Sequence, residues 1–484
     1  MSHPHFDLAA AARQAMTERG FEPQFPPAAA QQLDQLRQNP PHPSPSARDL
    51  RSLLWSSIDN DTSRDLDQIE YVEALPSGGH RVLIGIADVD AFVPKGSPID
   101  QHAMRETTTV YSGVENFSMI PEDLSTGLTS LLEGEERAAV VVEFTVDAQA
   151  NIAASDVYLA RVVNRAQLAY PSIGAWLAGG AAPPKVASSA DLQQQLRLQD
   201  EIAQRLRGQR YNHGALNLLT IETHPIHIAD GTIDIEAEVK NRATQLIEDF
   251  MIAANGVVAR AFDAAHRSSI RRVVKTPKRW DRIVTLAAGL GTKLPATPDP
   301  KPLHDFLCEQ QAKDPDHFAD LSLAIIKLLG PGEYVLEKPG QPSEGHFGLA
   351  VQDYTHSTAP NRRYADLVSQ RLLKAMIAKQ PSPYSDDELS AIAAQCTRME
   401  DAERKVSREM QKRIAAVAMS NRIGQAFDAI VTGVTEHGSF VRTIQPHVEG
   451  MLVRGQQGLD VGDKLRVTLV HTDPVRGFID FARA

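Results

Sequence analysis

Residues 424–482 read "GQAFDAIVTGVTEHGSFVRTIQPHVEGMLVRGQQGLDVGDKLRVTLVHTDPVRGFIDFA". β-Branched and polar residues alternate in about five short runs, and glycines stand at the bends between the runs. About five short strands with glycine at the bends are typical of a small closed barrel. We therefore expect residues 424–484 to form an all-β domain at the end of the chain.

Four pieces of this stretch carry a resemblance to a known module. "VTGVTEHGSFV", "EGMLV", "VGDKLRVTLV" and "DPVRGFIDF" resemble an S1-type OB fold, which binds RNA. The resemblance makes Phe440 and His437 candidates for stacking on bases. The alternative for both is packing in the barrel core, which we expect for Phe427.

A second unusual stretch, residues 56–70, reads "SSIDNDTSRDLDQIE". Its carboxylates are Asp59, Asp61, Asp65, Asp67 and Glu70. Counted from Asp59, oxygen-bearing side chains fall at the ligand positions of a calcium-binding EF-hand loop. Two features oppose calcium: position six is Arg64, where that loop needs glycine, and the flanks "IEYVEAL" and "HRVLIGIADV" alternate as strands rather than helices.

A catalytic magnesium site is the other explanation for the acidic stretch. Mg²⁺ binds few carboxylates and completes its shell with waters and phosphate oxygens. Asp65 and Asp67 are two residues apart, so on a strand they would face the same side, and Asp59 can return to them across the turn. We expect Asp61 to be a turn residue, and a solvated acidic turn without a metal remains the alternative.

The whole chain limits the class of protein. It has 484 residues, enough for two or three domains, and 50 basic against 61 acidic residues give a net charge of −11. This charge opposes a broad basic surface but allows a local basic channel. Basic residues gather in "SIRRVVKTPKRW" (269–280) and "RMEDAERKVSREMQKRI" (398–414), and each stretch alone indicates a solvated helix face.

The cellular compartment of the protein is indicated by its number of cysteines and by the lengths of its apolar runs. Cys308 and Cys396 are too few for a disulfide framework, which indicates a reducing, cytoplasmic environment. The first twenty residues lack the basic and apolar regions of a signal peptide. No apolar run is long enough to cross a bilayer, so we expect no membrane association.

The pattern along the chain divides it into three parts. Residues 1–48 predict two short helices, possible relatives of a helix-turn-helix, before the Pro-rich linker 39–47. Strands dominate residues 47–177, and residues 49–423 as a whole predict a mixed α/β catalytic domain. The expected helices cover residues 190–208, 239–265, 281–291, 320–330, 361–378 and 385–423.

Five motifs in order resemble the ribonuclease II family, the RNB exoribonucleases. They are "SSIDNDTSRDLDQIE" itself, "RVLIGIADVDAFVPKGSPIDQHAMRETTTVY" (81–111), "MIPEDLSTGLTSL" (119–131), "LIEDFMIAAN" (246–255) and "HFGLAVQDYTHSTAPNRRYADL" (346–367). The resemblance implies a Mg²⁺-dependent hydrolase that degrades single-stranded RNA processively from its 3′ end to 5′-nucleoside monophosphates, with two metal ions. It also implies no nucleotide cofactor, and we expect a monomer.

The resemblance assigns roles to individual residues. Asp59, Asp65 and Asp67 would hold the metal, with Asp67 assisting the nucleophile and Arg362 neutralising charge on the scissile phosphate. The simpler alternative for Arg362 is a surface pair with Asp366. The residues implied to bind RNA in this domain are Tyr111, Tyr170, Arg363, Glu403 and Glu248, with Asp249 as an alternative to Glu248 for contact with the 2′-hydroxyl.

Gln68 departs from the family pattern, which has an aspartate there. A neutral amide is a poorer ligand for Mg²⁺ than a carboxylate. The rival hypothesis is therefore a catalytically weakened relative that binds RNA. The family's bacterial members also carry cold-shock domains before the catalytic region, and residues 1–48 are too few for one.

Overall fold

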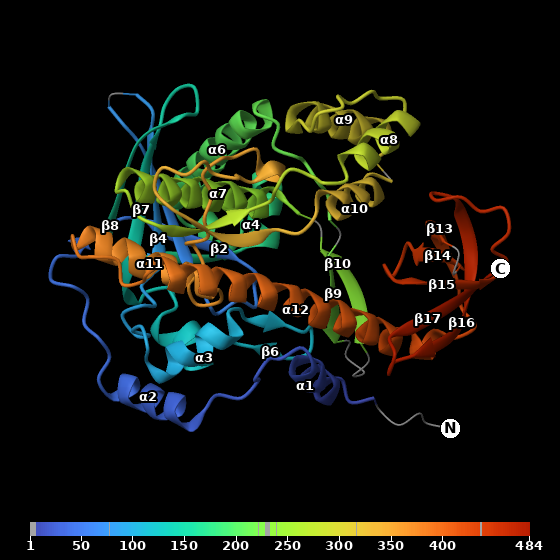
Figure 1. The fold of residues 1–484 in the computed structure, drawn as a ribbon, viewed down its shortest axis with the longest axis horizontal. Coiled ribbons are helices and arrows are strands. Elements are labelled where there is room, and N and C mark those ends of the chain that lie inside the picture. Colours follow the sequence, from blue (N-terminus) through green and yellow to red (C-terminus); the bar gives the residue numbers. More distant parts are fainter. Residues whose placement is uncertain are drawn as a thin grey trace.

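The computed structural model describes residues 6–76, 78–220, 222–227, 233–238, 240–315, 317–435 and 438–484. It has the expected mixed α/β architecture with a separate small barrel at the C-terminus (Figure 1). No helix in these ranges is both long enough and apolar enough to cross a membrane.

One strongly bent sheet organises the mixed α/β part of the chain, residues 49–423. Its strand order is β1-β8-β2-β3-β4-β7, and β8 also pairs with β7. β8 is long because its first part pairs with β7 and its last part with β2, so the sheet curls back on itself. The strands are β1 (Arg48–Asp49), β2 (Trp55–Asp59), β3 (Gln68–Ala74), β4 (His80–Ala87), β7 (Glu136–Val146) and β8 (Ile152–Ala169).

The register of β3 confirms the expected strands on one side of the acidic stretch. β3 and β4 are antiparallel, with Gln68 opposite Ile86 and Val72 opposite Val82. Ile69 and Val72 point to opposite faces of the strand and are both buried, so β3 is covered on both sides. Since β2 ends at Asp59 and β3 begins at Gln68, strands flank the acidic loop, and the EF-hand alternative is wrong.

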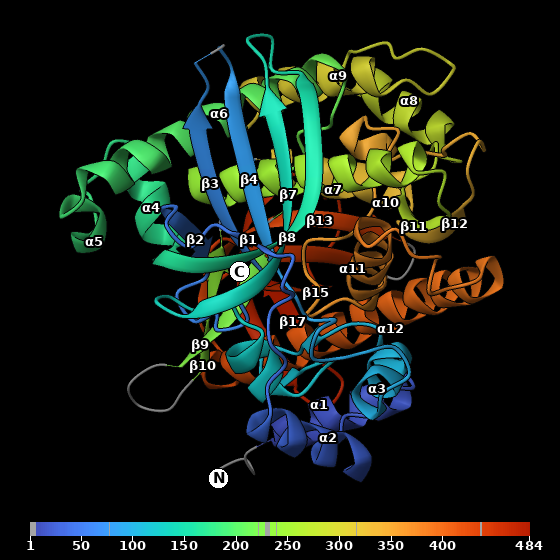
Figure 2. The same cartoon turned by 90° about the vertical axis from the view of Figure 1, so that its left-hand side faces the viewer.

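Helices cover the sheet. Helices α6 and α7 pack against it through contacts with β3 and β7, and Figure 2 shows α7 running across the strands. A capping box at Asn241 begins α7, so this helix starts close to the expected residue 239. The helices of this layer are α4 (Tyr170–Leu177), α5 (Pro184–Ala187), α6 (Ala190–Asn212), α7 (Arg242–Ala264) and α11 (Tyr364–Ile377).

Helix α12 (Asp386–Met419) connects the catalytic part to the barrel. It starts at a capping box in which Ser385 and Glu388 bind each other's backbone N–H groups. Its 34 residues span roughly 50 Å, and Figure 1 shows it crossing beneath the sheet towards the barrel. The prediction of one long helix here is confirmed, and buried apolar side chains line its inner face: Met399, Val406, Met410 and Ile414.

The C-terminal strands form a closed barrel of order β13-β14-β15-β17-β16, as predicted. Alternate side chains point inward, and Phe427 packs edge-on against the buried Phe481, so its expected place in the core is confirmed. The strands are β13 (Ala426–Thr435), β14 (Gly438–Thr443), β15 (Glu449–Arg454), β16 (Lys464–Asp473) and β17 (Phe478–Arg483).

The N-terminal helices are docked onto the catalytic domain. Helix α1 (Leu8–Glu18) packs on α12 in one apolar cluster, and α2 (Pro27–Gln38) packs on α3 (Pro98–Glu106). Asp7 caps α1, and a proline begins both α2 and α3. Two short strands, β5 (Val110–Tyr111) and β6 (Asn116–Phe117), pair beside α12.

A small helical unit stands between the sheet and the barrel. It consists of α8 (Trp280–Gly289), α9 (Pro300–Lys313) and α10 (Phe318–Leu329), which share their own apolar core. Helix α9 was not expected from the sequence; its start is set by the Asp299 cap and Pro300. Two further antiparallel pairs are β9 (Glu222–His227) with β10 (Ile233–Glu238) and β11 (Ser269–Val273) with β12 (Glu333–Glu337).

The first basic stretch corrects one expectation. Residues 269–273 form a strand and not a solvated helix face. Arg271 is only 1% exposed and pairs with Asp263 and Glu337. Its charge can be buried because two carboxylates compensate it, which the local sequence did not reveal.

Candidate active site

The acidic loop between β2 and β3 is fixed by hydrogen bonds to Ser130 and Leu131, which precede β7. Leu66 is 1% exposed; its N–H donates to Ser130 Oγ, and its carbonyl accepts from Leu131 N–H. Asp65 and Asp67 flank this residue in the chain; Asp65 is half-buried and Asp67 is buried. They lie in the loop before β3 and not on the strand itself, which corrects the predicted strand placement but keeps the predicted alternation.

Asp67 is the most deeply buried of the predicted metal ligands. Its side chain is 1% exposed, and Oδ1 accepts a hydrogen bond from the Asn361 backbone N–H at 3.0 Å. Oδ2 accepts none from the described residues, although Arg362 Nε lies 3.2 Å away. Burial raises the pKa of Asp67 to about 7, and Arg362 partly offsets the rise.

Asp59 and Asp65 stand nearer the surface of the same loop. Asp59 Oδ1 accepts hydrogen bonds from Asn60 N–H and Ser63 Oγ, and burial raises the pKa of its carboxyl. Asp65 Oδ2 accepts from the Tyr111 hydroxyl at 3.0 Å. The charge of Asp65 raises the pKa of both Asp59 and Asp67, so the three carboxylates share one electrostatic environment.

The donor set fits a metal ion that is completed by a substrate. Within the described ranges, no group of three or more Asp, Glu, His or Cys side chains is arranged as a finished metal cage. Oδ2 of Asp67 is nevertheless a buried oxygen without a hydrogen-bond donor, as a metal ligand would be. Since Mg²⁺ takes one or two carboxylates and borrows phosphate oxygens, Asp67 and its neighbours suit Mg²⁺ better than Ca²⁺.

Arg362 reaches the acidic loop from a distant part of the chain. It lies in the turn just before α11, where its carbonyl accepts from Thr109 N–H. Its side chain is 44% exposed, so donors remain free beyond the contact with Asp67. The alternative of an Arg362–Asp366 pair is wrong, because the buried Asp366 binds Arg363 in a bidentate pair instead.

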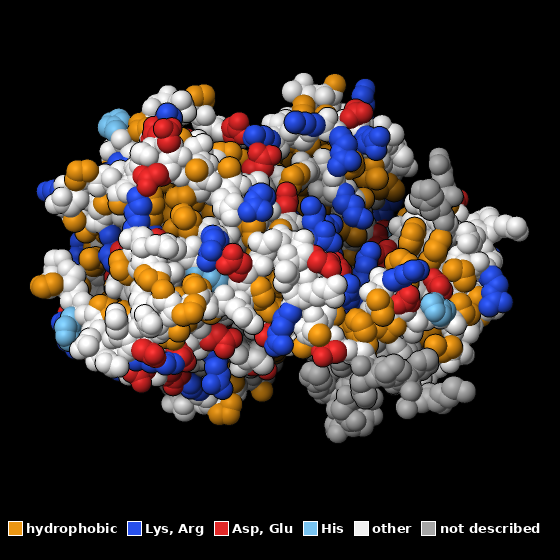
Figure 3. Space-filling view, turned by 60° about the horizontal axis from the view of Figure 1, so that its bottom comes forward, with side chains coloured by type: hydrophobic (Ala, Val, Ile, Leu, Met, Phe, Trp, Pro, Cys, Tyr) orange, Lys and Arg blue, Asp and Glu red, His pale blue; other side chains and the backbone are white. Residues whose placement is uncertain are grey.

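A channel of about 2700 Å³ leads from the acidic loop to the barrel. Its walls come from the loop 59–65, the β5–β6 hairpin, α10, α12 and one face of the barrel. Figure 3 shows the surface hollowed between the catalytic domain and the barrel, with Lys and Arg side chains gathered at the rim. The overall negative charge is therefore compatible with local basic character at this channel.

Three predicted aromatic residues line the channel. Tyr111 is 43% exposed, and its hydroxyl is fixed by Asp65. Tyr170 begins α4 and is half-buried on the same wall. Phe440 faces the channel from β14, half-buried on the outside of the barrel. His437 lies outside the described residues, and the roles of all these side chains in binding RNA stay predictions.

The remaining candidates lie farther from the channel. Glu403 accepts a hydrogen bond from Ser407 Oγ, and Ser407 itself lines the channel beside Tyr111. Glu248 is exposed and pairs with Lys240, while Asp249 is buried between Arg207 and Arg210. Glu248, Asp249 and Arg363 are not among the residues that line the channel in the described part of the chain.

Sequence reasoning missed the residues that position the loop. Ser130 Oγ binds Leu66 N–H and also donates to the carbonyl of Arg64, which fixes the loop's path. Asn361 supplies the backbone N–H on Asp67, and its side chain accepts from Thr129. Both residues lie inside motifs that had been recognised, but their partners are distant in sequence, so no local signal identified them.

Comparison with known proteins identifies the class. Residues 47–379 match the RNB domain, and residues 425–484 match the C-terminal S1 domain of RNase II-type exonucleases. The chain belongs to the RNB domain family.

Particular relatives are named Ribonuclease R. The Thermotoga maritima protein is 29% identical over 90% of this chain and 64% of its own length. The Escherichia coli protein is 29% identical over 88% of this chain and 54% of its own. The chain therefore spans between half and two thirds of the length of these relatives. The structure of Mycoplasma genitalium RNase R with ribose-methylated single-stranded RNA matches 99% of this chain and 78% of its own, with a TM-score of 0.86 and 23% identity.

Proposed function

We propose that this protein is a hydrolytic 3′→5′ exoribonuclease that degrades single-stranded RNA processively to 5′-nucleoside monophosphates. One observation carries the proposal: Arg362, which lines a channel that reaches the S1-type barrel, lies 3.2 Å from the buried Oδ2 of Asp67, which accepts no hydrogen bond from the described residues. An acidic centre beside a partly exposed guanidinium suits a phosphodiester, and a long channel suits a single strand.

The reaction needs a water, a phosphate and a leaving oxygen in line. Water adds to the phosphorus of the last phosphodiester, and the bond from phosphorus to the 3′-oxygen of the preceding nucleotide breaks. The released nucleotide keeps the phosphate on its 5′-oxygen, and the shortened RNA regains a 3′-hydroxyl. Arg362 would bind the non-bridging oxygens with the donors that Asp67 leaves free.

Asp59, Asp65 and Asp67 would hold Mg²⁺, with two ions in the reacting complex. Bound Mg²⁺ would promote ionisation of the attacking water and stabilise charge on the phosphate. Asp67 is suited to orient the water because the Asn361 N–H holds one of its oxygens and leaves the other free. Burial raises the pKa of Asp67 to about 7, and the charge of Arg362 offsets only part of the rise, so a bound cation would favour the ionised carboxylate.

The channel supports the choice of a single strand as substrate. Tyr111 is placed to stack on a base near the 3′ end, because the bond to Asp65 holds its ring at the edge of the loop. Tyr170 would lie near the terminal ribose. The structural neighbour from Mycoplasma genitalium was determined with single-stranded RNA, which supports the same ligand here.

A catalytically weakened RNA-binding protein is the second candidate. Gln68 favours it, because a neutral amide stands where the family motif has a carboxylate. Gln68 begins β3, is 4% exposed and does not line the channel within the described residues. Gln68→Asp tests the point: if position 68 contributes to the metal site, the Mg²⁺ concentration for half-maximal rate should fall in the variant. Identical magnesium titrations would place position 68 outside the site.

The decisive experiment uses the purified chain, 5′-labelled single-stranded RNA and Mg²⁺, with EDTA and a DNA of the same sequence as controls. We expect a short labelled end product with Mg²⁺, no product with EDTA and slow or absent cleavage of DNA. Uniformly labelled RNA should yield 5′-monophosphates on thin-layer chromatography. An intact RNA that migrates as a protein complex at every Mg²⁺ concentration would instead support the RNA-binding candidate.

A further inference from the structure

The two cysteines of the chain lie in different surroundings. Cys396 is buried in α12, whereas Cys308 is exposed on α9. Cys308 follows His304 by four residues, so the two side chains lie one above the other on the same face of the helix. The Sγ atom of Cys308 is 3.4 Å from Nε2 of His304. The exposed cysteine therefore has an imidazole nitrogen as its immediate neighbour.

His304 is held in one orientation through its other ring nitrogen. Nδ1 lies 2.6 Å from the carbonyl oxygen of Ala215, which can only accept, so Nδ1 carries the proton. The neutral ring therefore presents the lone pair of Nε2 to the sulfur of Cys308. His304 is 6% exposed, and Tyr211 packs on its ring with the two ring centroids 4.9 Å apart. These contacts fix the direction of the Nε2 lone pair.

The segment after α6 approaches the start of α9 closely, which brings the Ala215 carbonyl to His304. Gly214 has a φ of +96°, and a Cβ there would lie 2.6 Å from the backbone nitrogen of Lys301. Only glycine permits both this conformation and this approach. The N–H of Ala215 also donates to the carbonyl of Arg210 at the end of α6. The support for His304 thus comes from a different element of the fold and not from α9 itself.

The geometry of the pair matches two ligands of one tetrahedral metal ion. Zn²⁺ binds a thiolate sulfur at about 2.3 Å and an imidazole nitrogen at about 2.0–2.1 Å. At a tetrahedral angle these bonds place the sulfur and the nitrogen about 3.6 Å apart, close to the 3.4 Å between Cys308 and His304. A histidine that binds a metal usually donates its other ring N–H to a carbonyl or a carboxylate, as His304 does to Ala215.

We propose that His304 and Cys308 bind a divalent ion of the zinc type, such as Zn²⁺ or Co²⁺, on the surface of α9. Nitrogen and sulfur ligands favour these ions over Mg²⁺ and Ca²⁺, which take oxygen ligands. No third His, Cys, Asp or Glu side chain completes the site in the part of the chain that the structure describes, so water takes the remaining positions. On binding, the Cys308 thiol releases its proton to solvent, and the thiolate sulfur and the Nε2 lone pair each bond to the ion.

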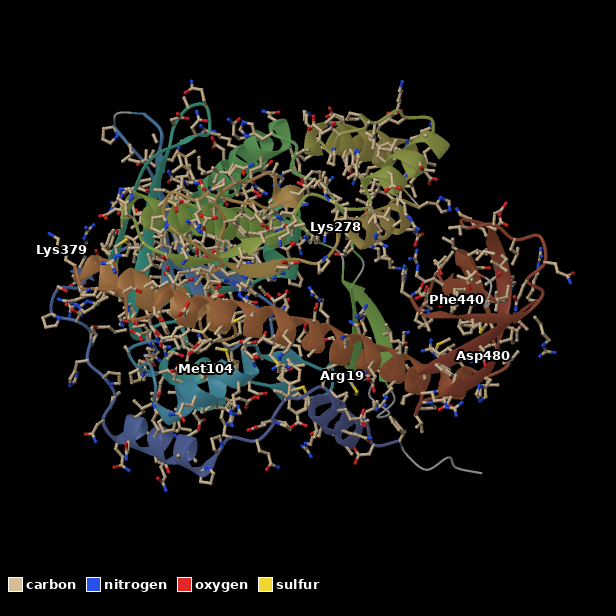
Figure 4. The ribbon with its side chains drawn as sticks, in the orientation of Figure 1. Arg19, Met104, Lys278, Lys379, Phe440 and Asp480 are labelled. Atoms are coloured by element: carbon tan, nitrogen blue, oxygen red, sulfur yellow. The ribbon has the colours of Figure 1, made fainter. Side chains whose placement is uncertain are left out.

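This site is separate from the acidic centre. Neither His304 nor Cys308 is among the described residues that line the channel. Figure 4 shows α9 at the top of the molecule and Phe440 on the barrel below it. The inference therefore goes beyond the proposed hydrolysis and does not depend on it. The expected effect of the ion is on stability, because a ligand that binds only the folded chain stabilises the fold.

The test is titration of Co²⁺ into the full chain, reduced and freed of metal. A thiolate bound to Co²⁺ absorbs in the near ultraviolet, whereas carboxylates do not give this band, so Co²⁺ at the acidic centre does not interfere. We expect the band to saturate at one ion per chain and to disappear when Zn²⁺ is added. Burial raises the pKa of the Cys308 thiol, and the bound form is the thiolate, so the band should strengthen as the pH rises.

Variants assign the ligands. Cys308→Ser should abolish the band, and Cys396→Ala, the matched control, should keep it. Loss of a residue that only supports a metal ligand costs about 10–100-fold in affinity, so His304→Gln, which removes a ligand, should weaken Co²⁺ binding at least as much. Zn²⁺ should protect Cys308 from alkylation and raise the Tm of the wild type more than that of Cys308→Ser.

Two results would overturn the site: no thiolate band in the wild type, or a band that persists in Cys308→Ser. Either result would leave the exoribonuclease proposal intact, because no hydrolysis is measured. Equally, a wild type that binds Co²⁺ through Cys308 and cleaves no RNA would support the metal site while contradicting the proposed function.

Discussion

At the scale of single residues, the site is defined by what Asp67 lacks. A buried carboxylate normally has hydrogen bonds or a charged partner for both oxygens. Asp67 has one firm donor, Asn361 N–H, and one oxygen that faces only Arg362. Arg362 and Asp67 are far apart in the chain. The turn before α11 brings the cation of Arg362 next to the anion of Asp67.

Asp67→Asn separates catalysis from folding. The amide keeps the acceptor for Asn361 N–H but removes the charge, so hydrolysis should fall by several orders of magnitude while RNA binding persists. Because burial raises the pKa of Asp67 to about 7, its charged form is disfavoured in the fold, and the variant should be at least as stable as the wild type at pH 8. Single-turnover cleavage and urea unfolding measure the two effects.

Asp61→Asn is the matched control for that substitution. Asp61 is exposed in the turn of the same loop and should affect neither rate nor stability appreciably. A near-normal rate for Asp67→Asn would remove Asp67 from the catalytic centre.

Tyr111 allows the ring to be tested apart from its hydroxyl. Tyr111→Ala removes the stacking surface, which is worth about 1–3 kcal/mol per base, so the final product should be longer with little change in rate on long RNA. Tyr111→Phe keeps the ring and loses only the bond to Asp65, so its product should match the wild type. A sequencing gel measures the length of the final product for each protein. Equal product lengths for Tyr111→Ala and the wild type would exclude stacking by Tyr111.

At the scale of elements, α3 fastens the N-terminal segment to the catalytic domain. Glu106, in the last turn of α3, accepts the Glu22 N–H with both carboxylate oxygens at 3.1 and 3.2 Å. Glu106 is 4% exposed, and burial raises its pKa from 4.5 to about 7. The contact between α3 and the segment after α1 therefore depends on pH.

Glu106→Gln should be more stable than the wild type at pH 8, and this advantage should be smaller at pH 5. Between pH 4.5 and 7 the folded protein keeps the Glu106 proton that the unfolded chain releases, so the wild type loses stability as the pH rises. Glutamine keeps an acceptor and does not ionise, so the difference in unfolding free energy should move in its favour by about 2–3 kcal/mol. Urea unfolding at the two pH values measures it.

Glu22→Gln is the control, since the Glu22 side chain is 56% exposed. It should show little change with pH. A Glu106→Gln variant whose advantage does not grow with pH would show that Glu106 is already ionised in the fold.

At the scale of the whole molecule, the ion pair of Arg442 and Asp320 joins two walls of the channel. Arg442 of β14 and Asp320 of α10 form a bidentate pair at 2.7 and 3.1 Å, with side chains 19% and 20% exposed. This contact joins the barrel to the helical unit α8–α10, which Figure 1 shows above it. A strand in the channel would thus be enclosed between the two parts.

Asp320→Asn should lower processivity on long RNA and leave the rate on short RNA unchanged. Loss of the pair lets the barrel separate from α10, so the strand escapes sooner; a single-encounter assay with an excess of unlabelled RNA measures this. If Arg442 instead served the phosphates directly, Asp320→Asn would free it and processivity would rise. The double exchange Asp320→Arg with Arg442→Asp should restore processivity if the pair itself matters.

The local sequence pattern was sufficient to predict most of the helices and strands named here. Alternation predicted β3 and β4, capping residues and apolar spacing predicted α7 and α12, and glycine at regular bends predicted the barrel. These signals depend on neighbours in sequence, so they are readable without tertiary contacts. The helix α9 was missed, and residues 269–273 were assigned to a helix face, because a buried arginine looks solvated until its partners are known.

The sequence by itself determined which kinds of residue the site contains. The tertiary structure decided which of the candidate residues come together. The acidic loop, Arg362, Tyr111 and Phe440 were identified from residue types and motifs. Only the fold showed that Arg362 meets Asp67 rather than Asp366, and that Glu248 pairs with Lys240 away from the channel. The reason is physical: each of these contacts depends on how separate elements pack, and the distance between elements is not encoded by the spacing of residues within them.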